Sequence, residues 1–184
     1  MSRVWKSISI AMLFAALGLN AFGATRSGTA TLYSPLKYKH EFNRASFDFS
    51  AGRLGTTTAW QLMYGNLHAG DDWDWFATSG SAGERSVIRD LGLVRWSRRL
   101  HVPVLEPRPQ LQPGQHEVVT VNTSGGEYDE WRDQNARFVR AVVGHTYALH
   151  VKNLSDDYYV LLRVDDIQRG DHCAFTWKRV KSPR

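Results

Sequence analysis

The sequence predicts an all-β protein, a single antiparallel β-sandwich of roughly eight to ten strands, with a closed β-barrel as the alternative architecture. Three observations lead to this prediction. Aromatic residues make up 12% of the 184 residues and occur in short clusters, as they do in strands. Apolar and polar side chains alternate between turn signals, which indicates strands that are buried on one face. After residue 23, no segment has the apolar period of an amphipathic helix.

The first 23 residues have the pattern of a secretory signal peptide. Arg3 and Lys6 form a positively charged start, and residues 8–19 form an apolar run without a charge. Residues 21–23, Ala-Phe-Gly, follow as a small-x-small triplet of the kind after which a signal peptidase cuts. The apolar run is shorter than the ~20 residues of a membrane-spanning helix, and no similar run follows it. We therefore expect an exported protein, periplasmic or secreted, without a transmembrane anchor.

The mature chain, residues 24–184, is expected to form one domain, because it is long enough to bury a hydrophobic core. Its one cysteine, Cys173, excludes an intramolecular disulfide, so the core alone must stabilise the fold. Cys173 also lies far from the predicted cleavage site, where a lipid anchor would need a cysteine. His172 would point to the opposite face of the predicted strand, which favours a buried structural thiol over a catalytic one.

The charge distribution bears on the class of partner. The chain has a net charge of +5, which falls by two when Arg3 and Lys6 leave with the signal peptide. Both signs are scattered along the sequence, and no basic stripe points to a nucleic-acid partner. Residues 178–184 form a basic C-terminal tail. Such a tail can contact phosphates or an anionic membrane, but with this small net charge we interpret it as a solvated end.

The first half of the mature chain contains short alternating segments separated by loops that contain glycine and serine. In the first segment, Phe47 and Phe49 alternate with serine and aspartate. In the second, Trp60, Leu62 and Tyr64 share one face. The strands predicted from this pattern are residues 46–50, 59–64, 73–78 and 87–91.

The last third of the chain predicts a four-stranded antiparallel meander. Gly144 and His145 form a two-residue turn of the kind that closes a hairpin. The alternation in each later strand indicates that one face is buried and the other is in water. The predicted strands are residues 138–143, 146–152, 158–164 and 172–180. The faces that share apolar side chains are Tyr147, Leu149 and Val151, then Tyr158, Val160, Leu162 and Val164, then Cys173, Phe175 and Trp177.

A proline-rich segment, residues 102–114, separates the two halves. It contains Pro103, Pro107, Pro109 and Pro113, which remove backbone donors and favour extended chain. The segment is either a crossover between two sheets or a linker between two domains. Each half alone would be marginal in size without disulfides. We therefore favour one sandwich, with the segment lying across an edge or an end.

The candidate ligand-binding residues are Asp72, Trp73, Asp74 and Trp75. Trp73 and Trp75 are two positions apart, so in a strand both rings project from one face. Flat aromatic rings on an exposed face stack on sugars, and the two carboxylates beside them can accept hydrogen bonds, so a glycan is one candidate ligand. The alternative is that these tryptophans belong to the core. The aspartates alone lack the ligand spacing of a calcium loop, so no metal site is assigned.

Other residue clusters carry weaker signals. Arg95, Arg98 and Arg99 surround Trp96, and His101 lies nearby. This basic and aromatic patch either receives an acidic polysaccharide or a phospholipid headgroup, or protects an edge strand from aggregation. The histidines show no metal-binding spacing. Trp131 and Trp177 have the same ambiguity between core and surface as the other tryptophans.

These observations predict an exported, non-catalytic β-domain that binds a glycan or another extracytoplasmic protein, or associates with the cell envelope through an open sheet edge. The alternative is a small secreted glycan hydrolase that uses a pair of acidic residues. Neither a nucleophile elbow nor a phosphate-binding glycine loop occurs, and no cofactor is expected. The acidic residues considered for such a pair are Glu84, Asp90, Glu127, Asp129, Glu130 and Asp133.

Overall fold

The structure is a computed structural model that describes residues 27–39, 41–65, 74–79, 84–97, 100–107 and 138–183. The predicted signal peptide and most of the proline-rich segment lie outside these residues. The described elements are β1 (Ser27–Tyr33), α1 (Phe42–Ala45), β2 (Ser46–Asp48), β3 (Arg53–Leu54), β4 (Leu62–Gly65), β5 (Trp75–Thr78), β6 (Val87–Asp90), β7 (Phe138–Arg140), β8 (Thr146–Lys152), β9 (Asp157–Gln168) and β10 (His172–Val180).

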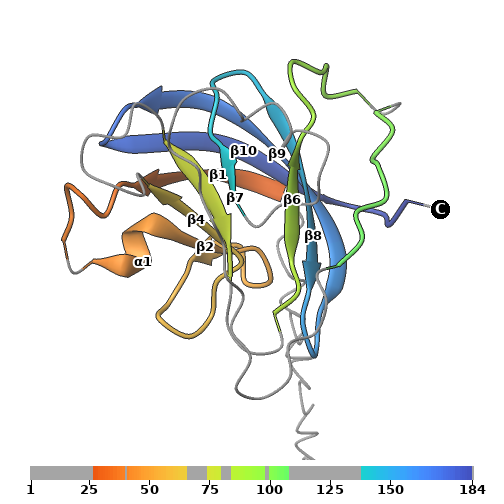
Figure 1. Ribbon diagram of the computed structural model, residues 1–184, viewed down its shortest axis with the longest axis horizontal. Helices are drawn as coiled ribbons and strands as arrows, with labels where there is room; N and C mark the ends of the chain where they lie inside the picture. The colour runs from red at the N-terminus through yellow and green to blue at the C-terminus, as the bar shows by residue number, and fades with distance from the viewer. Residues whose placement is uncertain are drawn as a thin grey trace, which may run out of the picture.

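The strands form two antiparallel sheets of five strands each (Figure 1). Sheet A has the order β1-β10-β9-β8-β6, and sheet B has the order β3-β2-β4-β5-β7. The described strands thus form the predicted two-sheet architecture, and they do not close into the alternative barrel, because no pairing joins the first and last strands of either sheet.

The main hydrophobic core lies between the two sheets. It contains the apolar faces that the alternation predicted in β8, β9 and β10, which meet residues of β2, β4 and β5. Aromatic side chains join the layers, since the rings of Phe49 and Phe47 lie 5.3 Å and 5.5 Å from that of Trp177, both edge to face. Cys173 is fully buried in this core, and burial raises the pKa of its thiol, as expected for a structural cysteine.

The predicted four-stranded meander is wrong in its first strand. β8, β9 and β10 are neighbours in sheet A, whereas β7 pairs with β5 in sheet B. The Tyr147 hydroxyl explains the path between the sheets, since it donates to the Arg140 carbonyl at 2.9 Å and accepts from the Val142 amide at 2.8 Å. Gly144, with φ of +80°, then turns the chain into sheet A instead of closing a hairpin.

β1 was not predicted, although it pairs with β10 along all seven of its residues. Its sequence alternates small apolar residues with Thr29 and Thr31, so the period of a strand is present. The apolar face consists only of Gly28, Ala30 and Leu32, which is a weak signal. Gly28 lies opposite Trp177, and a Cβ at this position would lie 3.3 Å from the indole nitrogen, so the glycine leaves room for the ring.

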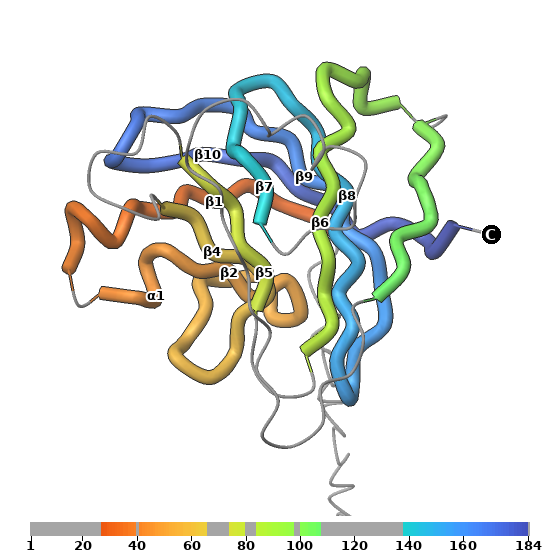
Figure 2. The backbone as a smooth tube through the Cα atoms, viewed as in Figure 1, coloured from red at the N-terminus to blue at the C-terminus, as the bar shows by residue number. Residues whose placement is uncertain are grey.

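A second hydrophobic cluster covers part of the outer face of sheet A. Leu105 is fully buried there against Tyr159 and Leu161 of β9, together with Val87 of β6 and Ala148 of β8. The chain after β6 therefore runs along the outside of β6 and β8, as Figure 2 shows for its green part. The proline-rich segment, as far as residue 107, lies on the sheet face and not only across an edge or an end.

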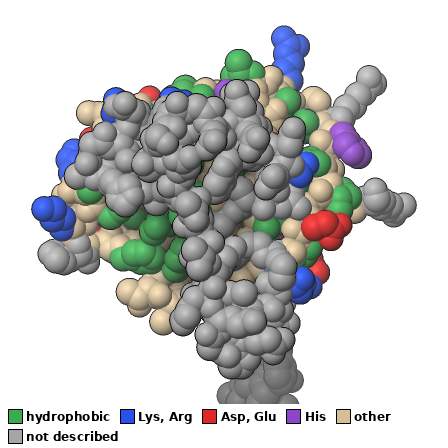
Figure 3. Space-filling view, in the orientation of Figure 1, with side chains coloured by type: hydrophobic (Ala, Val, Ile, Leu, Met, Phe, Trp, Pro, Cys, Tyr) green, Lys and Arg blue, Asp and Glu red, His purple; other side chains and the backbone are tan. Residues whose placement is uncertain are grey.

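The positions of the basic residues can be compared with the charge distribution expected from the sequence. Lys178 and Arg179, at the start of the predicted basic tail, belong to β10. On the face drawn in Figure 3, the described lysine and arginine side chains are spread around the margin rather than gathered into one patch. In the described residues there is no helix whose length and hydropathy would allow it to cross a membrane.

Candidate functional site

Asp74 and Trp75, two of the four predicted ligand-binding residues, are buried at the start of β5, Asp74 just before the strand and Trp75 as its first residue. The carboxylate of Asp74 is buried and accepts a hydrogen bond from the Tyr64 hydroxyl at 2.5 Å. The Gly170 amide, in the turn between β9 and β10, also points to this carboxylate at 3.3 Å. Burial, followed by the bond to Asp74, raises the pKa of Tyr64 far above its ordinary value. Asp74 therefore connects sheet B to a turn of sheet A.

Trp75 has a relative exposure of 4%, so its ring is packed within the protein rather than displayed on a face. Its burial agrees with the alternative to a displayed ring, but Trp75 lies on the face of β5 opposite Phe76 and is not part of the core between the sheets. Asp72 and Trp73 lie outside the described residues, so glycan binding by the four residues together stays a prediction. Among the described residues, no group of three or more histidine, cysteine or acidic side chains is arranged to hold a metal ion.

Trp96, the centre of the predicted basic and aromatic patch, lies on the outer face of sheet A and is not part of a strand. The Trp96 ring is partly buried against the second hydrophobic cluster. The Lys178 ammonium lies 4.9 Å and the Arg163 guanidinium 5.5 Å from the ring centre. These cations come from β10 and β9, far from Trp96 in sequence. Arg98 and Arg99 lie outside the described residues, and Trp131 does too.

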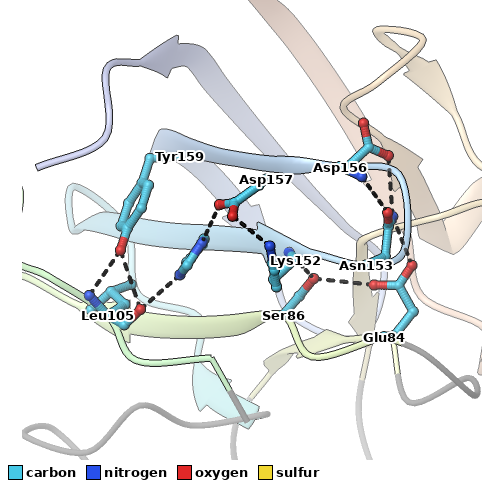
Figure 4. Close-up of polar contacts among 9 residues, drawn as sticks. Glu84, Ser86, Leu105, Lys152, Asn153, Asp156, Asp157 and Tyr159 are labelled. Carbon is cyan, nitrogen blue, oxygen red and sulfur yellow. Dashed lines mark hydrogen bonds and ion pairs between the residues drawn. The ribbon is translucent and has the colours of Figure 1, made fainter. Parts of the chain in front are cut away.

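His150 of β8 forms the centre of a polar cluster that fixes the segment containing Leu105 (Figure 4). Its Nδ1 lies 2.7 Å from the Leu105 carbonyl oxygen, and its Nε2 lies 2.9 Å from Oδ1 of Asp157. The ring stacks on Tyr159 with centres 4.3 Å apart. The Tyr159 hydroxyl completes the attachment, because it accepts from the Leu105 amide at 3.1 Å and donates to the Leu105 carbonyl at 3.2 Å. Hydrogen bonds from Lys152 and then His150 hold the pKa of Asp157 below its ordinary value.

The same figure shows a second group of polar residues at the turn between β8 and β9 (Figure 4). The Asn153 side-chain amide donates to Glu84 and to Asp156, each at 3.1 Å. Ser86 donates to the other oxygen of Glu84 at 3.2 Å. These bonds connect the chain before β6 to the hairpin. Two carboxylates thus approach each other here, but the amide of Asn153 occupies the position between them.

The other acidic candidate for hydrolysis in the described residues, Asp90, is also engaged. It accepts a hydrogen bond from the Gly92 amide at 2.7 Å, and its carboxylate lies 2.8 Å from Nδ1 of His145. The remaining candidates are Glu127, Asp129, Glu130 and Asp133, and they lie outside the described residues.

β1 forms one edge of sheet A. One hydrogen bond shows which backbone groups of β1 point toward β10 and which point away from the sheet. The Ser34 amide, just after β1, donates to the Asp171 carbonyl at 2.7 Å. Backbone groups alternate in direction along a strand, so Gly28, Ala30 and Leu32 bond to β10. The amides and carbonyls of the other four strand residues then point away from sheet A. These residues are Ser27, Thr29, Thr31 and Tyr33.

β1 differs from the other described edge strands in length and in charge. In sheet B, β3 has two residues and includes Arg53, and β7 has three and includes Arg140. The opposite edge of sheet A, β6, has four residues and includes Arg89 and Asp90. β1 has seven residues without a charge or a proline. Charges, prolines and short lengths protect edges from pairing with another chain, and β1 has none of these three features, while α1 and β4 lie close to it.

Comparisons of this protein with protein-family models, with curated proteins and with solved structures found no match. The class of protein is therefore defined by its fold, an antiparallel β-sandwich in which the described residues form two five-stranded sheets. The particular function has to be argued from the residues of the chain.

Proposed function

We propose that this protein is an exported, non-catalytic binding module, and that it binds another extracytoplasmic protein by accepting an extended strand at β1. The observation that carries the proposal is the edge itself. Four residues of β1 direct their amides and carbonyls away from the sheet, and no hydrogen bond between described residues occupies these groups. An added strand would satisfy them, which is how β-strand addition obtains its affinity.

The alternatives have less support in the described residues. A glycan-binding face needs displayed rings, and the ring of Trp75 is buried. A hydrolase of this type needs two carboxylates separated by space for the substrate, whereas the amide of Asn153 stands between Glu84 and Asp156. Export is proposed from the signal-peptide pattern of the first 23 residues, and the compartment is periplasmic or extracellular.

A peptide that shares no sequence with β1 tests strand addition, because main-chain bonds tolerate different side chains. The probe is a soluble peptide of alternating threonine and valine, and the control is the same peptide with N-methyl groups on alternate residues. Amide hydrogen exchange at Thr29 and Thr31 is expected to slow several-fold with the probe and to stay unchanged with the control. Equal exchange in the presence of both peptides would contradict the proposed function.

The variant Thr31→Pro provides a second test of the same edge. Its amide points away from β10, so a proline there removes a donor for the added strand and leaves the pairing with β10 in place. We expect the variant to fold but not to bind the probe peptide. The matched variant Ala30→Pro removes an amide that bonds to β10 and is expected to destabilise the fold. If Thr31→Pro bound the peptide as tightly as the wild type, the peptide would bind at a site other than the β1 edge.

A further inference from the structure

We propose that the strand that adds to β1 is β1 of a second copy of this chain, in a two-fold symmetric, antiparallel pair. This inference rests on the proposed function, because it names the occupant of the same edge. The pair would join the two copies of sheet A into one continuous sheet. Symmetric dimers that use the same patch on both subunits are the commonest protein oligomers.

The register follows from the directions of the backbone groups. A two-fold axis that passes between the Ala30 residues of the two copies pairs Thr29 with the second copy's Thr31, and Ser27 with its Tyr33. All four of these residues direct their amides and carbonyls outward, so each pair is a hydrogen-bonded pair. This register therefore uses every outward-pointing group of both strands, and a shift by one residue would use none.

The side chains are compatible with this register. Thr29 and Thr31 lie on the outer face of sheet A, opposite Thr176 and Ala174 of β10. In the pair, each threonine meets a threonine of the second copy, a combination that stabilises neighbouring strands. On the inner face, Ala30 meets Ala30 of the second copy. Ala30 packs against the main core and is only partly buried, so a second strand would cover it further.

The charged residues next to β1 do not oppose this pairing. Lys178 lies opposite Ser27, and it has no acidic partner among the described residues. At the other end of β1, His172 lies opposite Tyr33 and contacts Asp166, whose side chain is 65% exposed. The two-fold axis brings the lysine end of each copy toward the aspartate end of the other. Strands are about 4.8 Å apart, so roughly 14 Å separates Lys178 from the second copy's His172, and dissolved salt screens most of the interaction between these charges.

Sedimentation velocity of the purified protein over a range of concentrations tests the dimer. We expect a sedimentation coefficient that rises with concentration for the wild type. Two double variants test the register. Thr29→Lys with Thr31→Lys places like charges opposite each other, whereas Thr29→Lys with Thr31→Glu places opposite charges there. The dissociation constants of these two variants are expected to differ on the order of tenfold or more, with the Lys/Glu variant associating more tightly. Circular dichroism of both variants checks that they fold alike.

The outcomes separate this inference from the proposed function. A wild type that stays monomeric at every concentration overturns the second copy as occupant, and equal association of the two double variants does so as well. In either case, protection of Thr29 and Thr31 by the threonine and valine peptide would leave strand addition by a different protein intact. Absence of that protection in a monomeric wild type would overturn both proposals.

Discussion

The carbonyl oxygen of Leu105 lies 2.7 Å from Nδ1 of His150, and this contact joins the proline-containing segment to the outer face of sheet A. The other ring nitrogen faces Asp157 at 2.9 Å. Both partners are hydrogen-bond acceptors, so a ring nitrogen that carries a hydrogen donates to the partner it faces. His150 was among the histidines to which the sequence assigned no function. Its role emerges from Leu105, which is 45 positions away in the chain.

Replacement of His150 by alanine is expected to lower the free energy of unfolding by about 1–3 kcal/mol, because the buried Leu105 carbonyl loses a hydrogen-bond partner and a buried ring that stacks on Tyr159 is removed. The segment around Leu105 should also become more sensitive to limited proteolysis. Urea denaturation and protease digestion measure the two effects. His101→Ala is the matched control, because His101 is an exposed histidine on the same segment. Similar stability of both variants would show that the His150 contacts do not hold the segment.

Leu105→Ala tests the second hydrophobic cluster. The Leu105 side chain is 0% exposed, so its truncation should lower the free energy of unfolding by about 2–5 kcal/mol. The neighbouring Val104 is 52% exposed, and Val104→Ala should change stability by no more than about 0.5 kcal/mol. Thermal and urea unfolding of the two variants check this difference. Equal effects would mean that the segment is not packed on sheet A.

The bond between Tyr64 and Asp74 predicts that Asp74 stabilises the fold. Tyr64→Phe removes a 2.5 Å hydrogen bond to a buried carboxylate, so we expect a loss of about 1.5–3 kcal/mol in the free energy of unfolding. Tyr38→Phe is the control, because no hydrogen bond of its hydroxyl occurs among the described residues, and it should be nearly neutral. Urea denaturation compares them. If Tyr64→Phe did not change the stability, Asp74 would not have the structural role inferred here, and its role as a ligand-binding residue would have to be considered again.

Alkaline pH should destabilise the protein through its buried tyrosines. Burial is the main cause that raises the pKa of Tyr158 from 10.0 to about 12, and burial also raises the pKa of Tyr147. A raised pKa means that the folded state prefers the neutral phenol. The stabilisation from Tyr158 is therefore complete below pH 10 and is lost as the pH rises through about 12.

Parallel titrations followed by tyrosinate absorbance and by circular dichroism measure this effect. The buried tyrosines should ionise together with loss of structure, and Tyr158→Phe should reduce the fall in stability above pH 10. Ionisation of every tyrosine near pH 10 in a protein that stays folded would contradict the assigned burial.

Several parts of the fold were predictable because they depend on local alternation. Val160, Leu162 and Val164 share a face in the sequence and line the core in the structure. The exit of β7 into sheet B was not predictable, because it depends on pairing with β5 and on bonds from the Tyr147 hydroxyl to the backbone, and the alternation of apolar residues shows neither. The role of Asp74 was not predictable either. In the sequence it looks like a carboxylate in a loop, and only the structure shows that Tyr64 and Gly170 form hydrogen bonds to it.

By itself, the sequence determined that this protein is rich in strands and which faces of β8, β9 and β10 are apolar, because side-chain direction alternates with a period of two in any strand. The tertiary structure alone decided which strands are neighbours, that Leu105 meets His150, and that β1 forms an uncharged edge. These features depend on contacts between residues that are distant in the chain, and local alternation carries no information about partners.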